Sequence, residues 1–273
     1  MARQRLGQHF LADPEWREQI ARAIRISPQS FAPFPSAQEE PSCWIEIGAG
    51  HGEMTERLAS SGLPVHAVEL DQPLVERLQR LAKQFPNLHV VPGDALETNI
   101  ATLAAGRRVR IYGNLPYYIT SPILHHLFTF ADVIEEMHIV IQTEVALRLT
   151  AQPNSKLYGY LSVATQLYTR PEFVFRIPRG AFRPPPEVGS ALVTLRFPGA
   201  RGNLANLDDM RFLGFVKSCF SQKRKTLVNN LRSLAGPGRV REALASLDLR
   251  PDSRAEQLSV FDLAALDGVL NPT

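Results

Sequence analysis

Short apolar runs alternate with helical patterns over residues 43–149, and this alternation constrains the fold more than any other feature of the sequence. Between the runs, apolar residues recur at three- and four-residue spacing, which is typical of helices packed on a core. Parallel strands need a crossover connection, usually a helix, so the alternation predicts a mainly parallel sheet with helices on both faces. The predicted strands are Cys43–Ile47, Val65–Val68, His89–Val91, Val109–Tyr112 and Met137–Ile141.

The regular alternation of strand and helix patterns ends after Pro153. Residues 158–168 predict one more helix. The runs Phe173–Ile177 and Ala191–Leu195 then alternate apolar and polar residues like strands. Two late strands added to a parallel series favour a mixed sheet with an antiparallel edge strand.

A linker is predicted at residues 198–208, where small and polar residues replace the apolar pattern. Beyond it the chain reads as helical only, and Ser259 and Asp262 have the spacing of a capping box before the last helix. A chain of 273 residues is long enough for one large and one small domain. We therefore predict an α/β domain over residues 1–200 and an all-helical domain over residues 208–273.

Composition excludes several classes of protein. No apolar run approaches the length of a membrane span, and the N-terminus lacks an apolar signal core. Cys43 and Cys219 are far apart among apolar neighbours, which predicts buried free thiols in a reducing compartment. No Cys/His cluster has metal-binding spacing. The net charge is only +3, but residues 217–232 contain five basic residues and no acid, so a polyanionic partner is expected.

Three successive predicted strands end in glycines or acids. Gly48, Gly50 and Gly52 follow the first strand, Glu69 ends the second and Asp94 follows the third. Glycines before a helix let a ligand approach the backbone, and carboxylates at the next strand ends can accept from ribose hydroxyls and an adenine amine. The spacing is Gly-x-Gly-x-Gly rather than the Gly-x-Gly-x-x-Gly of nicotinamide and flavin enzymes. This edge therefore favours S-adenosylmethionine as the ligand.

A fourth strand leads into Gly113-Asn114-Leu115-Pro116-Tyr117-Tyr118. Pro116 fixes its own φ and biases Leu115 toward an extended conformation, which sets the direction of the Leu115 carbonyl. An amide, an oriented carbonyl and an aromatic ring together suit a flat ring that carries an amine. Alone, the same letters also describe an ordinary loop, so the interpretation depends on the strand ends before it.

Read in chain order, the motifs are Gly7-Gln-His-Phe-Leu11, Glu46-Ile-Gly-Ala-Gly50, Val68-Glu-Leu-Asp71, Gly93-Asp-Ala95, Gly113-Asn-Leu-Pro-Tyr117, Phe182-Arg-Pro-Pro-Pro186 and Phe220-Ser-Gln-Lys-Arg-Lys-Thr-Leu227. Together they resemble the motifs of small-subunit (16S) ribosomal RNA adenine N6,N6-dimethyltransferases, almost from end to end. The resemblance implies a Rossmann-like class I methyltransferase sheet with a helical C-terminal domain.

The resemblance implies a set of positions that bind S-adenosylmethionine. His9 departs from the Asn that is common at its position, and a ring nitrogen makes only one of the two kinds of hydrogen bond that an amide makes. The Pro-rich stretch at residues 28–42 is longer than is usual in the family, and we attach no function to it. The implied cofactor positions are His9, Leu11, Gly48, Gly50, Glu69, Asp94 and Asn114.

The expected reaction is transfer of a methyl group to adenine N6, whose lone pair is delocalised into the ring. We expect the Asn114 side-chain oxygen and the Leu115 carbonyl to accept the N6 hydrogens and free the lone pair. Tyr117 would stack on one face of the base and Phe182 on the other. Alignment would supply most of the catalysis, with no metal and no strong general base.

The basic residues of the C-terminal part are expected to bind RNA. Lys223, Arg224 and Lys225 are predicted on the outer face of a helix, and they would contact phosphates, which give affinity but no sequence information. Arg3, Arg5, Arg176, Arg179 and Arg183 are expected to extend this positive surface. The resemblance implies 16S rRNA within a pre-30S subunit as partner, two adjacent adenines of its 3′-terminal hairpin as target, and a cytoplasmic monomer.

Three other functions compete with this one. An adenine-DNA or protein-glutamine methyltransferase more often has Pro-Pro-Tyr after its Asp or Asn, and lacks the C-terminal module. A non-catalytic ribosome-assembly or transcription factor would not need an intact Gly48, Glu69, Asp94 and Asn114. A drug-resistance methylase acting on large-subunit rRNA shares the fold and the motif, although the sequence of residues 254–259 is more similar to the small-subunit enzymes.

Overall fold

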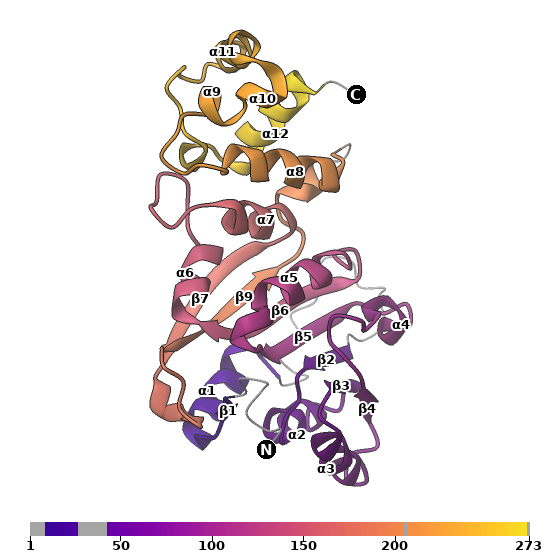
Figure 1. Cartoon of the computed structure of the whole chain (residues 1–273). Helices are drawn as coiled ribbons and strands as arrows, with labels where there is room; N and C mark the ends of the chain where they lie inside the picture. Colours follow the sequence, from indigo (N-terminus) through magenta and orange to yellow (C-terminus); the bar gives the residue numbers. More distant parts are fainter. Residues whose placement is uncertain (1–8, 27–42, 205–206, 272–273) are drawn as a thin grey trace. The chain divides into compact units, whose positions relative to one another are not determined.

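The structure is a computed structural model that describes residues 9–26, 43–204 and 207–271 (Figure 1). The Pro-rich stretch at 28–42 and the basic residues Arg3 and Arg5 lie outside the described residues. The strands are β1 (Phe10–Leu11), β2 (Cys43–Ile47), β3 (Val65–Glu69), β4 (Leu88–Pro92), β5 (Val109–Asn114), β6 (Ile134–Gln142), β7 (Arg170–Ile177), β8 (Phe182–Arg183) and β9 (Ser190–Arg196).

Helices separate most of these strands, as the alternation predicts. The α-helices are α1 (Pro14–Ala23), α2 (Glu53–Ala59), α3 (Gln72–Ala82), α4 (Ile100–Ala104), α5 (Thr120–Phe128), α6 (Thr143–Leu149), α7 (Tyr160–Tyr168), α8 (Asp209–Cys219), α9 (Leu227–Asn230), α10 (Arg232–Ala235), α11 (Pro237–Ser246) and α12 (Val260–Leu270).

A seven-stranded sheet has the order β4-β3-β2-β5-β6-β9-β7. Strands β2 to β6 pair in parallel, and β9 pairs antiparallel with β6, which confirms the predicted mixed sheet. The strand β1 pairs instead with β8 in a separate two-stranded sheet. Helices α1, α2 and α3 pack on the face that carries Trp44 and Tyr112, and α5 lies on the opposite face (Figure 1).

The chain forms two compact units, Met1–Ala146 with Glu172–Phe197, and Leu147–Pro171 with Pro198–Thr273. The second unit thus begins earlier than the predicted helical domain, because α7 belongs to it. Val163, Ala164 and Leu167 of α7 share a buried core with Phe212 and Val216 of α8. The position of α7 in the sequence predicts that it belongs to the sheet domain, but its packing places it in the helical unit.

Local signals explain several helix ends. Asp13 caps α1 by accepting hydrogen bonds from Glu15 N and Trp16 N. The predicted capping box is present, since Ser259 Oγ accepts from Asp262 N and the Asp262 carboxylate accepts from Ser259 N. Asp71 stands at the N-cap position of α3, but its side chain makes no capping bond. Cys43 and Cys219 are both buried free thiols, as predicted.

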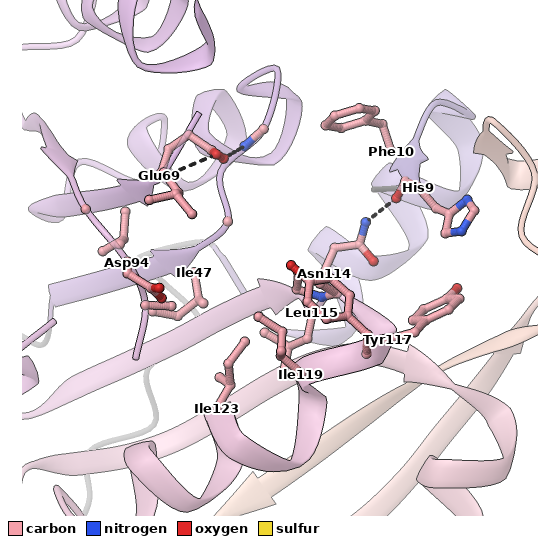
Figure 2. A pocket seen from close by; sticks show the side chains of 18 residues that line it. His9, Phe10, Ile47, Glu69, Asp94, Asn114, Leu115, Tyr117, Ile119 and Ile123 are labelled. Atoms are coloured by element: carbon pink, nitrogen blue, oxygen red, sulfur yellow. Dashed lines mark hydrogen bonds between the residues drawn. The ribbon is translucent and has the colours of Figure 1, made fainter. Parts of the chain in front are cut away.

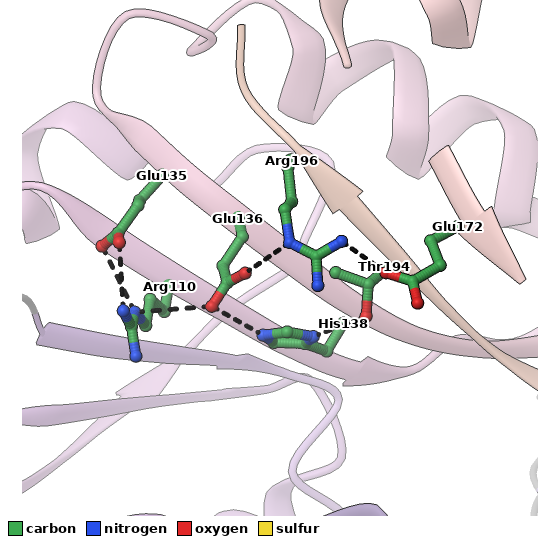
Figure 3. Close-up of polar contacts among 7 residues, drawn as sticks. All are labelled: Arg110, Glu135, Glu136, His138, Glu172, Thr194 and Arg196. Carbon is green, nitrogen blue, oxygen red and sulfur yellow. Dashed lines mark hydrogen bonds and ion pairs between the residues drawn. The ribbon is translucent and has the colours of Figure 1, made fainter. Parts of the chain in front are cut away.

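A network of charged side chains crosses the first unit's sheet on β5, β6 and β9 (Figure 3). Glu136 lies at its centre, within 3.6 Å of Arg110 and 3.5 Å of Arg196, and 3.3 Å from His138 Nε2. Burial alone would raise the Glu136 pKa, but the His138 hydrogen bond and the nearby positive charges together lower it. The network thus lets a mostly buried carboxylate stay ionised within the sheet.

Among the described helices, none is long and apolar enough to cross a membrane.

Candidate active site

A pocket lies where the carboxyl ends of β2, β3, β4 and β5 meet at one edge of the sheet (Figure 2). It contains about 800 Å³ of space free of protein atoms, counting the part open to solvent. Its lining consists of His9, Phe10, Ile47, Gly48, Gly50, Val68, Glu69, Leu70, Gly93, Asp94, Ala95, residues 114–119 and Ile123.

The glycine turn after β2 forms one wall of the pocket. Gly48 and Gly50 have φ values of +71° and +58°, in the left-handed region that favours glycine. A Cβ on Gly48 would meet no atom within 4 Å, whereas a Cβ on Gly50 would approach the Phe10 ring to 3.1 Å. The turn therefore needs glycine for its backbone at both positions, and at Gly48 it also leaves open space beside the main chain.

The Glu69 carboxylate ties the end of β3 to this turn. Its Oε2 accepts from Gly50 N at 2.8 Å, and its Oε1 accepts from Leu70 N and Asp71 N, both at 3.0 Å. An ionised carboxylate has about four acceptor positions, so three are filled and about one remains on Oε2. The side chain is 3% exposed and is therefore held in place before any ligand arrives.

Asp94 stands at the end of β4 beside apolar side chains. Its Oδ1 accepts from Leu96 N at 2.9 Å, and no donor from the described part of the chain reaches Oδ2. Figure 2 shows Ile47, Ile119 and Ile123 on the same side of the pocket. An apolar slot with one free carboxylate oxygen beside it can hold a planar ring that carries an amine.

The Asn114 amide has a fixed orientation. Its Nδ2 donates to the backbone carbonyl of His9 at 2.7 Å. A carbonyl can only accept, so this bond determines which end of the amide is nitrogen and leaves Oδ1 as a free acceptor. Leu115 N donates to Val140 O at 3.0 Å. Within residues 9–26, 43–204 and 207–271, no donor reaches the Leu115 carbonyl, so two acceptor oxygens lie next to each other in the sequence.

Tyr117 is the first residue of the short 3₁₀ helix η2 (Tyr117–Ile119). Its side chain has one partner at the hydroxyl and another on the face of the ring. Its hydroxyl is 2.6 Å from Ser190 Oγ, and its ring stacks on His9 with centroids 5.4 Å apart and planes at 30°. Burial raises the Tyr117 pKa, although the Ser190 hydrogen bond lowers it. His9 Nδ1 is 2.9 Å from the Pro184 carbonyl and must donate to it, so Nδ1 carries a hydrogen.

Two of the residues predicted to contact the cofactor or the base do not line the pocket. Phe182 is fully buried, and Leu11, its partner across the β1–β8 pair, is 6% exposed. Both side chains belong to the core under α1 and α2. The stacking role predicted for Phe182 does not fit this structure, because its ring has no face free for a base.

The basic residues Lys223, Arg224 and Lys225 are exposed, but the prediction that they lie on a helix is wrong. They occupy a turn between α8 and α9 in the second unit. Asn230 Nδ2 donates to the carbonyls of Cys219 and Gln222, at 2.6 and 3.1 Å. This side chain satisfies the carbonyl of the last α8 residue and one carbonyl within the turn, and so favours a turn over a continued helix.

Several lining residues were not identified from the sequence. Phe10 packs against the His51 ring, with centroids 4.2 Å apart, and closes over Gly50. Its place beside His9 in one motif was the available signal. Ile119 has no sequence signal for a site, and Ile123 had only the helical spacing of a core residue. Within the part of the chain that the structure describes, no group of three or more His, Cys, Asp or Glu residues could hold a metal ion.

The fold and the pocket together define a class of protein. A mainly parallel seven-stranded sheet with one antiparallel strand near its edge, a glycine turn after β2 and acids at the ends of β3 and β4 are the features of a class I methyltransferase. The Asn-Leu-Pro-Tyr stretch lies in the same pocket, at the end of β5.

Comparison with known proteins identifies the family. The model of the family described as ribosomal RNA adenine dimethylase matches residues 1–267, and the chain belongs to this family. The ribosomal RNA small subunit methyltransferase A of Xanthomonas campestris pv. campestris (strain B100) is 37% identical over 268 residues, which cover 98% of this chain and 96% of that protein. The protein of the same name from Xanthomonas oryzae pv. oryzae (strain PXO99A) is 38% identical with the same coverage.

Solved structures agree on the fold. A dimethyladenosine transferase from Plasmodium falciparum superposes with a TM-score of 0.74 at 22% identity, covering 94% of this chain and 96% of that one. The 23S rRNA methyltransferase ErmE superposes with a TM-score of 0.68 at 25% identity, covering 96% of this chain and 99% of that one. The family and the fold imply S-adenosylmethionine as methyl donor and ribosomal RNA as substrate.

Proposed function

We propose that this protein dimethylates N6 of two adjacent adenines in the 3′-terminal hairpin of 16S rRNA during ribosome biogenesis, with S-adenosylmethionine as donor. The substrate is 16S rRNA within a pre-30S subunit, and the enzyme acts as a cytoplasmic monomer that needs no metal. The choice of the small subunit is supported by relatives at 37–38% identity that are named small subunit methyltransferases.

One observation carries the catalytic proposal. The His9 carbonyl holds the Asn114 amide nitrogen, so Asn114 Oδ1 and the Leu115 carbonyl are two acceptors in one pocket. Adenine N6 has two hydrogens. If each hydrogen is donated to one of these oxygens, the amine is rotated and pyramidalised, and its lone pair becomes available.

The other residues of the pocket fit the methyl donor. The open space at Gly48 admits the amino-acid part of the donor next to the main chain, and the remaining acceptor position on Glu69 Oε2 suits a ribose hydroxyl. Asp94 Oδ2 suits the adenine amine of the donor, with Ile119 and Ile123 beside the ring. When bound, S-adenosylmethionine supplies an electrophilic methyl group on a positively charged sulfur.

The protein's own contribution is alignment. Asn114 and Leu115 hold N6, and Tyr117 supports one face of the base, so the lone pair points along one line. The proton that leaves the methylated nitrogen is acidic enough to pass to water, and no side chain has to remove it. A second transfer to the same nitrogen then requires space for the first methyl group.

The second unit is proposed to bind rRNA through the exposed turn at Lys223, Arg224 and Lys225. Phosphate contacts of this kind give affinity and orientation. Folded rRNA would then be recognised mainly by shape, which is the usual mode for structured RNA.

The decisive experiment compares substrates directly. The protein is incubated with methyl-labelled S-adenosylmethionine and either unmethylated small subunits, large subunits or DNA, and the label is mapped by nuclease digestion and mass spectrometry. We expect dimethyladenine at two adjacent positions near the 3′ end of 16S rRNA. Asn114→Ala, which we expect to be slower on the order of a hundredfold, serves as the low-activity control.

Each other outcome contradicts a specific part of the proposal. Label in 23S rRNA would make the protein a large-subunit methylase, the alternative that its similarity to ErmE supports. Binding to small subunits without transfer of label would indicate a non-catalytic assembly factor.

A further inference from the structure

The hydroxyl of Tyr117 is bonded to a serine on a strand that is not adjacent to its own. Tyr117 Oη and Ser190 Oγ are 2.6 Å apart. Tyr117 follows β5 and Ser190 begins β9, and β6 lies between these two strands in the sheet. The side chain therefore reaches past the end of β6, and its tip is attached to a different strand from its backbone.

Ser190 is itself held rigidly. It is fully buried, and its backbone is paired with Gln142 of β6. Its carbonyl accepts from Thr143 Oγ1 at 3.0 Å, and Thr143 N donates to the Gly189 carbonyl at 2.9 Å. Because the backbone is fixed on both sides, the position of Ser190 Oγ depends on a single side-chain torsion.

The bond at the tip of the side chain fixes the direction in which the ring projects. A tyrosine side chain has two torsions, and Oη lies on the axis of the second one. The hydrogen bond to Ser190 therefore restrains χ1 and the direction of the Cβ–Oη axis, while the stacked His9 ring restrains rotation about that axis. Phenylalanine at position 117 would offer the same aromatic faces without the attachment. Stacking requires only an aromatic ring, so it does not explain why residue 117 carries a hydroxyl. The hydrogen bond to Ser190 does explain it.

We propose that Ser190 is a positioning residue for methyl transfer, because its hydrogen bond sets the direction in which the Tyr117 ring projects, and the target adenine stacks on this ring. This inference rests on the proposed function, which assigns the base to Tyr117. A displaced ring would carry adenine N6 away from the acceptors at Asn114 and Leu115, and the rate depends on that alignment. Ser190 acts only through Tyr117 and does not touch the base.

A double-mutant cycle tests the proposal. Ser190→Ala and Tyr117→Phe remove the same hydrogen bond from its two ends. We expect each to lower kcat/KM for small subunits by about 3- to 10-fold, the effect of one lost hydrogen bond. The double variant should be no slower than the worse single variant, because the bond can be lost only once. Ser190→Thr, which keeps the hydroxyl, should stay close to the wild-type rate.

Two further measurements separate positioning from a purely structural role. The affinity for S-adenosylmethionine, measured by equilibrium dialysis, should be unchanged in Ser190→Ala while kcat falls. Ser61→Ala is the matched control, because Ser61 is a buried serine of the same unit whose hydroxyl donates to Leu58 O at 2.6 Å outside the pocket. It should methylate at the wild-type rate.

The outcomes are distinct. Additive losses in the double variant, or a Ser190→Ala enzyme with unchanged kcat, would overturn the positioning role and leave the proposed function intact. A wild-type protein that methylates no small subunits would overturn the proposed function itself. If Ser190→Ala does not fold, Tyr117→Phe removes the same bond, and a wild-type rate for that variant would equally refute the inference.

Discussion

Replacing Asn114 tests the catalytic geometry most directly, because this one side chain makes two separable interactions. Its Nδ2 donates to the His9 carbonyl at 2.7 Å, and its Oδ1 is the free acceptor in the pocket. Asn114→Ala removes both interactions. Loss of one oriented hydrogen bond at the reacting group should slow methyl transfer on the order of a hundredfold, or about 3 kcal/mol of barrier.

Asn114→Asp separates the two interactions. The carboxylate keeps acceptor oxygens for adenine N6 but cannot donate to the His9 carbonyl, so two oxygens face each other. The lost bond and the unfavourable contact should cost about 1–3 kcal/mol. As a result, the variant holds its acceptor oxygen and the His9 backbone less accurately than wild type does. We therefore expect the Asp variant to be faster than the Ala variant and slower than wild type.

The assay is single-turnover methyl transfer to small subunits at saturating donor, which reports the chemical step and not donor affinity. Asn87→Ala is the matched control. Asn87 is an amide of the same unit that donates to Ala59 O at 2.8 Å and Leu63 O at 2.7 Å, outside the pocket. It should lower stability and leave the rate per folded molecule unchanged. Near wild-type transfer by Asn114→Ala would refute the proposed role of this residue.

Three other outcomes are expected. Burial raises the Glu46 pKa to about 8, so wild-type stability falls as the pH rises from the carboxyl's usual 4.5 through that value. The free energy of unfolding of Glu46→Gln relative to wild type, measured with urea, should therefore rise by about 1.4 kcal/mol per pH unit between these two values. An equal advantage at pH 5 and pH 9 would contradict this. Phe182→Ala should lose about 3–5 kcal/mol of stability, and an unchanged unfolding midpoint would mean that the ring is not core. Charge reversal at residues 223–225 should flatten the salt dependence of rRNA binding, whereas reversal at exposed Lys83 should not.

The sheet edge was predictable because it depends on local patterns and one topological rule. Each strand is visible as an apolar run, and parallel strands bring their carboxyl ends to one edge. Gly48, Glu69, Asp94 and Asn114 are far apart in the sequence, yet they line one pocket as predicted. Their positions follow from the strand ends alone and require no knowledge of side-chain packing.

Features that depend on a distant partner were not predictable in this way. The basic run at residues 223–225 lies between two helical patterns and reads as helix. The Asn230 amide, which donates to the carbonyls of Cys219 at the end of α8 and of Gln222 beyond it, favours a turn instead. The bond between Tyr117 and Ser190 joins residues 73 positions apart, and it depends on the order of β5, β6 and β9. Strand order is not encoded in the spacing of apolar residues.

Phe182 is an example of a residue whose predicted role in stacking on the base is excluded by a contact with a distant segment, the pairing of β1 with β8. A phenylalanine before three prolines reads as an exposed loop residue, but two short strands from opposite ends of the first unit pair there. Leu11 lies opposite Phe182, and the Ala181 carbonyl accepts from Ala12 N and Asp13 N. This pairing buries the ring, so an exposed Phe182 would require β1 to separate from β8.

The aromatic ring that faces Tyr117 in this structure is His9 and not Phe182. The centroids of the two rings are 5.4 Å apart, whereas a base between two rings needs about 7 Å, twice an ordinary contact of about 3.5 Å. The target adenine can thus stack on Tyr117 only on the face away from His9, or after the His9 ring turns aside. Turning aside would break the bond from Nδ1 to the Pro184 carbonyl, while the bond from Asn114 to the His9 backbone could remain. The first alternative leaves all of these contacts in place, so it is the simpler path to the aligned complex.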